Sequence, residues 1–203
     1  MIQYKNISLE FNNQTLFKHF NLTINRHEKV LLNAPSGSGK TTLMKLVLGF
    51  IKPDSGDIIV DGITMTSKTL KEIRSKIAYV SQDVDLYNQR VNELLSNILN
   101  YKVNKDLKFD ELEMDKLFNV FNINHVRTKM IEELSGGERQ RLGLVTALLL
   151  KRPILLLDEI TSGLDKKMKE KVVSYILSLD QTMLIISHDQ LWKEHDQIKV
   201  VEW

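Results

Sequence analysis

The sequence predicts an α/β fold with a mostly parallel central sheet, an antiparallel β subdomain near the N-terminus and a helical subdomain inserted into the body. Short apolar runs, typical of buried strands, alternate with segments whose apolar residues have helical spacing, as in parallel sheets covered by helices. Strand signals are missing from about residue 84 to residue 141, where charged residues separate helix-spaced apolar ones. The 203 residues, 42% of them hydrophobic, suit a single domain over residues 1–203.

The N-terminal part has the pattern of strands from residue 2 to residue 32. Ile7, Leu9 and Phe11 alternate with other residues, and Val30–Leu32 is a short run typical of a buried strand. A stretch rich in glycine and serine follows. Behind that stretch we expect a helix, because apolar residues recur at helical spacing: Leu43, Leu46, Val47 and Phe50.

The middle of the chain begins with turn residues at Pro53–Gly56. Strands are expected over Ile58–Val60 and Lys76–Ser81, and helices over Val91–Leu99 and Leu112–Phe121. These two helices form the predicted helical subdomain.

The sequence of the last third of the chain predicts one long helix and two buried strands. The helix starts behind Ser135 and is ended by Pro153. Ile154–Leu157 is fully apolar and precedes two acids, and Met183–Ile186 precedes Ser-His-Asp. Because the carboxyl ends of parallel strands meet at one edge of a sheet, we expect these polar residues to lie together.

Composition excludes several classes of protein. The formal net charge of +2 gives no bulk electrostatic attraction to nucleic acid. With no cysteine, the chain can form neither a disulfide framework nor a thiolate metal site. The first residues, MIQYKNISLEF, lack the apolar run of a signal peptide, and no window approaches 18 apolar residues.

Ser36–Thr41 (SGSGKT) has the pattern of a phosphate-binding loop. Backbone N–H groups can converge on phosphate oxygens where glycine leaves room, and the following helix N-terminus attracts anions. Lys40 is expected to pair with the β- and γ-phosphates, and the Thr41 hydroxyl to ligate Mg²⁺. The usual pattern begins with glycine where this chain has Ala34, which costs little unless that position needs a positive φ. The expected phosphate-site residues are Ala34, Pro35, Ser36, Gly37, Ser38, Gly39, Lys40, Thr41 and Thr42.

Two acids follow the apolar strand Ile154–Leu157. An aspartate at the end of a buried strand beside a phosphate loop can hold Mg²⁺, usually through water. An adjacent glutamate can orient and deprotonate an attacking water. We therefore expect Asp158 to act as a metal ligand and Glu159 as a general base. This combination is typical of P-loop NTPases, which include kinases, GTPases and ATPases.

The stretch Leu134–Arg141 (LSGGERQR) narrows these classes. Ser135 and Glu138 have the spacing of a capping box, so one interpretation is simply a well-started helix. Capping alone does not require both Gly136 and Gly137, whereas two glycines and a serine let an anion approach a helix N-terminus closely. We interpret this turn as a second anion site, remote in sequence from the first.

With these motifs the whole chain resembles the ATP-binding subunits of ABC transporters. The resemblance covers essentially the full length, in order, and any one motif alone would be ambiguous. In this sequence the motifs are the aromatic Phe11 that would stack on adenine, the Walker A loop Ala34–Thr41, the Q-loop Gln82, the signature Leu134–Glu138, the Walker B strand Ile154–Glu159, the D-loop Ser162–Asp165 and the switch residue His188.

The resemblance implies a head-to-tail dimer of two such domains. Each ATP would lie between the Lys40 loop of one copy and the turn Ser135, Gly136 and Gly137 of the other. Asp165 would reach across the dimer, although it is equally suited to be a helix N-cap.

The resemblance also implies roles around the triphosphate. Glu159 would be the general base, and His188 would contact the γ-phosphate. Gln82 would contact Mg²⁺ or its water and report the nucleotide state to the membrane partner. The implied ligands are ATP and Mg²⁺. The implied partners are a second copy, in a homodimer, and a separate transmembrane permease, which would hold this cytoplasmic chain at the inner face of the cell membrane.

The amino-acid sequence at two motifs is similar to that of exporter-type ATPases, including small stand-alone iron-export-type and peptide-export-type ones. Ile160 stands after the glutamate where family members often have proline, and Leu86-Tyr87 follows the Q-loop. Two alternatives remain: a soluble ABC-type ATPase that is not coupled to transport, and a small-molecule P-loop kinase. The single copy of each motif disfavours the first, and the second leaves the signature turn without a use.

Residues 83–101, including Tyr87, Val91, Leu94 and Leu95, are candidates for the groove that receives a coupling helix of the permease, with core packing as the alternative. Four other histidines lack a strand-end setting and are expected to be structural or surface residues: His19, His27, His125 and His195.

Overall fold

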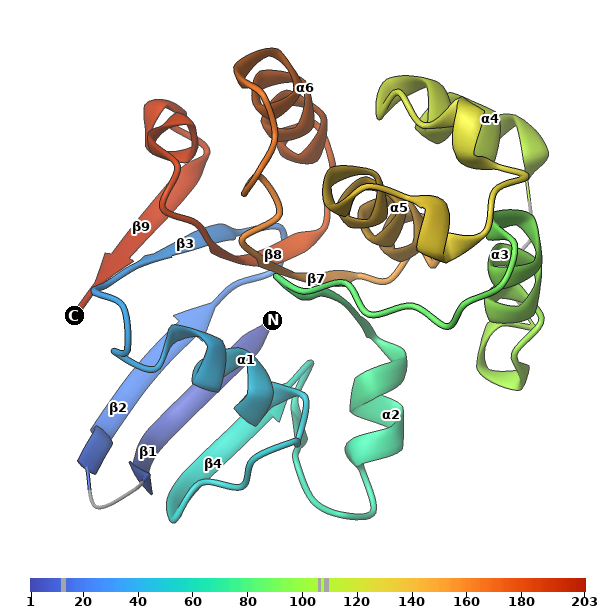
Figure 1. Cartoon of the computed structure of the whole chain (residues 1–203). Coiled ribbons are helices and arrows are strands. Elements are labelled where there is room, and N and C mark those ends of the chain that lie inside the picture. The colour runs from blue at the N-terminus through green and yellow to red at the C-terminus, as the bar shows by residue number, and fades with distance from the viewer. Residues whose placement is uncertain (12–13, 106, 108–109) are drawn as a thin grey trace.

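The computed structural model describes residues 1–11, 14–105, 107 and 110–203, and it contains two sheets (Figure 1). The larger sheet is parallel, in the strand order β6 (Ile77–Val80), β7 (Ile154–Asp158), β8 (Thr182–Ile186), β3 (Lys29–Asn33) and β9 (Ile198–Glu202). The smaller sheet is antiparallel, in the order β2 (Gln14–Ile24), β1 (Ile2–Phe11), β4 (Ser55–Val60) and β5 (Ile63–Thr64). Both predicted sheet types are confirmed.

Six α-helices connect these strands in the described residues, with four short 3₁₀ turns between them. The α-helices are α1 (Lys40–Val47), α2 (Leu70–Ser75), α3 (Val91–Leu99), α4 (Glu111–Val120), α5 (Gly136–Leu149) and α6 (Lys166–Leu177). The 3₁₀ turns are η1 (Lys102–Asn104), η2 (Asn124–Val126), η3 (Ile131–Glu133) and η4 (Gln190–Glu194).

The central strands β7 and β8 are buried on both faces of the parallel sheet, which explains the apolar runs Ile154–Leu157 and Met183–Ile186. Along β7, Ile154 and Leu156 pack into one core with α1 and the antiparallel sheet. Leu155 and Leu157 pack into the other core with α3, α4, α5 and α6. Figure 1 shows the same layers, with β1, β2 and β4 on one side of the parallel strands and α5 and α6 on the other.

Between β6 and α5, the described residues contain helices and turns and one isolated bridge, Arg90 to Met130. The expected helices agree closely with α3 and α4. Figure 1 shows both beside α5, away from the antiparallel sheet. The bounds 84–141 of a helical subdomain stay a prediction, and residue 141 falls inside α5.

Two details of the predicted helices are wrong. Phe50 lies beyond the end of α1 and is 62% exposed, with the Arg74 guanidinium 4.9 Å from its ring centroid. The chain leaves the helix at Gly49, whose φ of 66° is a common exit from helices. Similarly, α5 ends at Leu149, ahead of Pro153, because Lys151 already has φ 49°.

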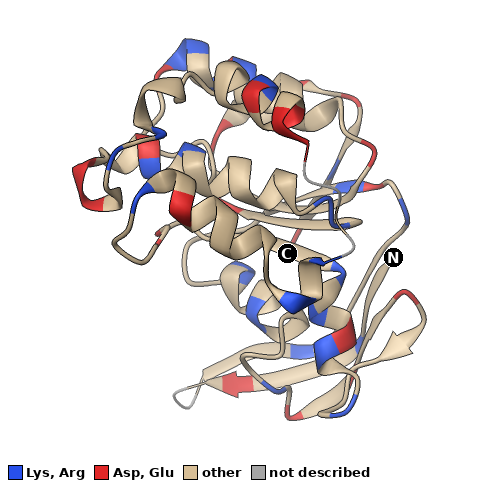
Figure 2. Cartoon of the chain, turned by 90° about the vertical axis from the view of Figure 1, so that its right-hand side faces the viewer, with Lys and Arg blue, Asp and Glu red and all other residues tan. Residues whose placement is uncertain are grey.

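No helix in the described parts of the chain is long and apolar enough to span a bilayer. On the side drawn in Figure 2, blue basic and red acidic residues are interspersed over the helices and loops.

Candidate nucleotide-binding site

The phosphate loop joins β3 to α1 at the carboxyl edge of the parallel sheet. Gly37 and Gly39 have φ of 80° and 96°, in the left-handed region that residues with a Cβ avoid. A Cβ on Gly39 would also lie 2.6 Å from Cζ of the buried Phe17. Ala34 is not among the described residues with positive φ, so an alanine fits the first position of the motif.

Lys40 opens α1 and is largely buried, with 8% of its surface exposed. Its Nζ donates to the backbone oxygens of Ala34 (2.6 Å) and Pro35 (3.0 Å). These contacts hold the ammonium against the loop that is expected to wrap a triphosphate. A third donor position of this ammonium remains for an anion.

Asp158 ends β7 directly beside α1. The Thr41 hydroxyl donates to Asp158 Oδ2 at 3.1 Å, and burial together with the Asp158 charge raises the pKa of Tyr79 to about 12. Burial raises the pKa of Asp158, against the lowering effects of Thr41, Lys40, Lys45 and Tyr79. A hydroxyl and a carboxylate side by side form an oxygen donor set that fits Mg²⁺.

Glu159 has an unusual backbone conformation, with φ 52°. Its N–H donates to the Ile186 oxygen on β8 at 2.9 Å. Its Oε1 is buried without a hydrogen-bond partner among the described residues and lies 3.6 Å from His188 Nε2. Burial raises the pKa of Glu159, and the His188 backbone N–H and ring oppose that rise. A carboxylate with a raised pKa and a free oxygen is suited to accept a proton.

One cavity of about 450 Å³ brings most of the predicted site residues together. Its walls come from four parts of the structure: the ends of β1 and β2, the phosphate loop, the Q-loop, and the carboxyl ends of β7 and β8. The lining residues are Phe11, Gln14, Leu16, Ser36, Gly37, Gly39, Lys40, Thr41, Thr42, Gln82, Asp158, Glu159, Ile186 and His188. Phe11 is 54% exposed, as an aromatic platform for a flat ligand requires.

The signature turn does not line this cavity. Ser135 and Gly136 are exposed, and a Cβ on Gly136 would meet no heavy atom within 4 Å. Ser135 caps α5 through the predicted capping box, in which its hydroxyl accepts from the Glu138 N–H at 3.3 Å and the Ser135 N–H donates to Glu138 Oε2 at 2.8 Å. Asp165 likewise caps α6 by accepting from the Met168 N–H at 3.0 Å.

Sequence reasoning missed three polar contacts around this machinery. The Tyr79 hydroxyl lies close enough to Asp158 for that carboxylate to raise its pKa, the buried Gln140 donates to the backbone oxygen of Glu159, and His125 contacts Glu138 through Nε2 at 2.5 Å. Gln140 was detectable as a polar residue among the apolar positions of its helix. Tyr79 and His125 had no such signal, because tertiary packing alone brings them to their partners.

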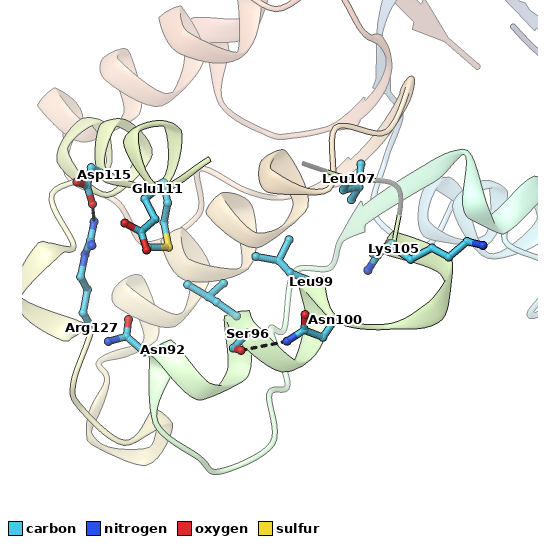
Figure 3. A pocket seen from close by; sticks show the side chains of 12 residues that line it. Asn92, Ser96, Leu99, Asn100, Lys105, Leu107, Glu111, Asp115 and Arg127 are labelled. Carbon is cyan, nitrogen blue, oxygen red and sulfur yellow. Dashed lines mark hydrogen bonds and ion pairs between the residues drawn. The ribbon is translucent and has the colours of Figure 1, made fainter. Parts of the chain in front are cut away.

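The predicted coupling-helix groove is only partly available. Val91, Leu94 and Leu95 are at most 4% exposed, so for these three the core-packing alternative is correct. Tyr87 is 87% exposed. Leu95 also lines a separate cavity of about 750 Å³ between α3 and α4, whose rim carries the ion pair of Arg127 and Asp115 (Figure 3).

Comparisons with known proteins agree with this geometry. A family model described as ABC transporter matches residues 17–162. The energy-coupling factor transporter ATP-binding protein EcfA1 of Mycoplasmopsis synoviae is 30% identical, over 93% of this chain and 74% of its own. The molybdate/tungstate import ATP-binding protein WtpC of Methanocaldococcus jannaschii is 36% identical, over 93% of this chain and 63% of its own. This chain therefore spans about two thirds to three quarters of these relatives.

The dimeric structure of MJ0796, a bacterial ABC transporter cassette, superposes with a TM-score of 0.83 at 25% identity, over 100% of this chain and 94% of that one. The predicted P-loop NTPase fold, with its parallel sheet and antiparallel β subdomain, is confirmed by this match. The family match and the site together establish an ATP-binding, ATP-hydrolysing domain: the chain belongs to the ABC transporter family, as one of its nucleotide-binding domains.

Proposed function

We propose that this chain powers a bacterial membrane exporter, by hydrolysing ATP with Mg²⁺ in a head-to-tail homodimer. One observation carries the dimer: the cavity gathers the loop, the acids and His188, while the signature turn faces solvent outside it. Two incomplete anion sites in one chain are completed when a second copy presents its turn to the first copy's loop. ATP then stabilises the dimer, and hydrolysis weakens it.

The residues of the cavity divide the work on the triphosphate. In this proposal the Lys40 ammonium and the N–H groups of residues 36–42 bind the phosphates, and Phe11 stacks on the adenine. Thr41, Asp158 and Gln82 would hold Mg²⁺, which would neutralise phosphate charge when bound. Glu159 accepts the proton of the attacking water, and His188 stays beside both its carboxylate and the γ-phosphate.

Glu159→Gln tests the mechanism. The variant keeps the shape of the site and loses the proton acceptor, so we expect ATP binding without appreciable hydrolysis and an ATP-dependent dimer on a sizing column. Glu170→Gln on the exposed face of α6 is the matched control and should behave as the unmodified protein. A Glu159→Gln protein that stays monomeric at saturating ATP would contradict the dimer, and one that hydrolyses ATP normally would contradict the general base.

The exporter assignment is supported by the amino-acid sequence around Ile160 and Tyr87, which is similar to that of exporter-type ATPases. The relative WtpC is by name an import protein, so similarity to this family does not by itself give the direction of transport. We propose that the chain is a cytoplasmic subunit held on the inner face of the membrane by a separate permease, with Tyr87 at the contact. A multi-span membrane protein encoded in the adjacent open reading frame would identify that permease, and transport by the two co-reconstituted proteins would give the direction. Loss of membrane association on deleting the permease would support the proposal. A chain that is soluble while the permease is present would favour the uncoupled ATPase, and unchanged membrane association without the permease would contradict its role as the anchor.

A further inference from the structure

Gln140 lies in the helix that carries the signature turn, one turn after the two glycines. It is 7% exposed, and its Nε2 donates to the backbone oxygen of Glu159 at 2.8 Å. A buried side-chain amide needs partners for its polar atoms, so this contact is a specific interaction and not a chance approach of surface groups.

The backbone of Glu159 needs such support. Its φ of 52° lies in the left-handed region, which is disfavoured for every residue with a Cβ and persists only where neighbours hold it. The Glu159 N–H is held by Ile186 at 2.9 Å. The backbone carbonyl oxygen of Glu159 accepts from two donors, the Ser162 N–H at 3.0 Å and Gln140 Nε2 at 2.8 Å.

Each of these three hydrogen-bonding partners of the Glu159 backbone belongs to a different part of the site. Ile186 is the last residue of β8, two residues before His188, and Ser162 belongs to the D-loop. Gln140 is the holder that comes from α5, whose first residues form the exposed signature turn. The peptide that orients the Glu159 carboxylate is therefore connected to the helix that faces the other nucleotide of the dimer.

We propose that Gln140 is a positioning residue, which fixes the backbone of Glu159 for hydrolysis and connects it to the signature helix of the same chain. This inference rests on the proposed general-base role of Glu159. Gln140 does not line the nucleotide cavity, so it acts on the rate of hydrolysis and not on the binding of ATP.

Two variants separate the hydrogen bond from the packing. Gln140→Met keeps an unbranched buried side chain and removes the amide, while Gln140→Glu keeps the shape and replaces the donor by an acceptor. For both we expect kcat to fall by about ten- to a hundredfold, the range in which misplacement of a catalytic group is felt. The Kd for ATP, measured with a fluorescent analogue, should stay within about twofold.

Thr146→Val is the matched control, because the Thr146 hydroxyl donates only to the Leu142 oxygen within the same helix, at 2.8 Å. It should leave kcat unchanged. If the buried charge of Gln140→Glu prevents folding, as a thermal melt would show, Gln140→Met alone decides.

A folded Gln140→Met protein with unchanged kcat would overturn the proposal. So would a loss of ATP affinity as large as the loss of kcat, because it would show general damage to the site. Failure of the proposed function has a different signature: the unmodified protein would then hydrolyse no ATP, or Glu159→Gln would hydrolyse it normally.

Discussion

Gly39→Ala should destabilise the protein more than the same change two residues earlier. At Gly39 the φ of 96° costs a residue with a Cβ about 1–2 kcal/mol. The new Cβ also lies 2.6 Å from Phe17 Cζ, and Phe17 is 3% exposed and packed on Phe20 with ring centroids 5.3 Å apart. Forcing such a ring to move adds about 1–3 kcal/mol. We therefore expect a total loss of about 2–5 kcal/mol.

Gly37→Ala is the control, because its φ of 80° carries the same backbone penalty but a Cβ there meets no heavy atom within 4 Å. The free energies of unfolding of the two variants, measured by urea denaturation, should differ by the cost of the steric overlap alone, about 1–3 kcal/mol. Adding Phe17→Leu to Gly39→Ala should recover part of that difference, which a double-mutant cycle measures. Equal losses for Gly37→Ala and Gly39→Ala would refute the steric reasoning.

Three further changes test other parts of the molecule. Lys40→Ala should abolish binding of a fluorescent ATP analogue while leaving the melting temperature nearly unchanged, because the bonds of Lys40 Nζ within the described part of the chain are to its own loop; unaltered affinity would refute the loop assignment. The pKa of Glu138 is lowered from 4.5 to about 2, chiefly by the Ser135 hydroxyl, so its contribution to stability is present above pH 4.5 and is lost as the pH falls through 2. Urea titrations at stepped pH should show a shallower acid loss for Glu138→Gln, and parallel curves would exclude this role. Tyr4→Phe removes the buried bond from Tyr4 Oη to the Leu43 oxygen (2.8 Å) and should cost about 1 kcal/mol by urea denaturation, whereas an unchanged midpoint would show that the bond is not stabilising.

The sequence predicts those features that depend on local pattern. β7 and β8 contain the apolar runs Ile154–Leu157 and Met183–Ile186 because both faces of these strands are covered, so the strands and the polar residues after the runs could be predicted directly. The glycine-rich pattern SGSGKT predicted a loop between a strand and a helix, in which Gly37 and Gly39 have positive φ, and the serine–glutamate spacing predicted the start of α5.

Features that depend on packing between distant segments were not predictable. Whether helix-spaced residues such as Val91 face a core or a groove depends on which helix covers them, and the pattern is identical in both cases. The left-handed backbone of Glu159 could not be foreseen, because its holders Ile186 and Gln140 are brought to it only by the fold.

The exposed position of Ser135 and Gly136, outside the cavity of their own chain, has a genetic consequence. In the proposed head-to-tail homodimer, a copy with a damaged turn would keep its own phosphate loop, catalytic glutamate and switch histidine. The defect would lie in the other site, because the ATP bound to the phosphate loop of the intact copy would lack a signature turn. In a cell that expresses both alleles, such a lesion should therefore behave as a dominant one, whereas an allele that cannot fold should be recessive.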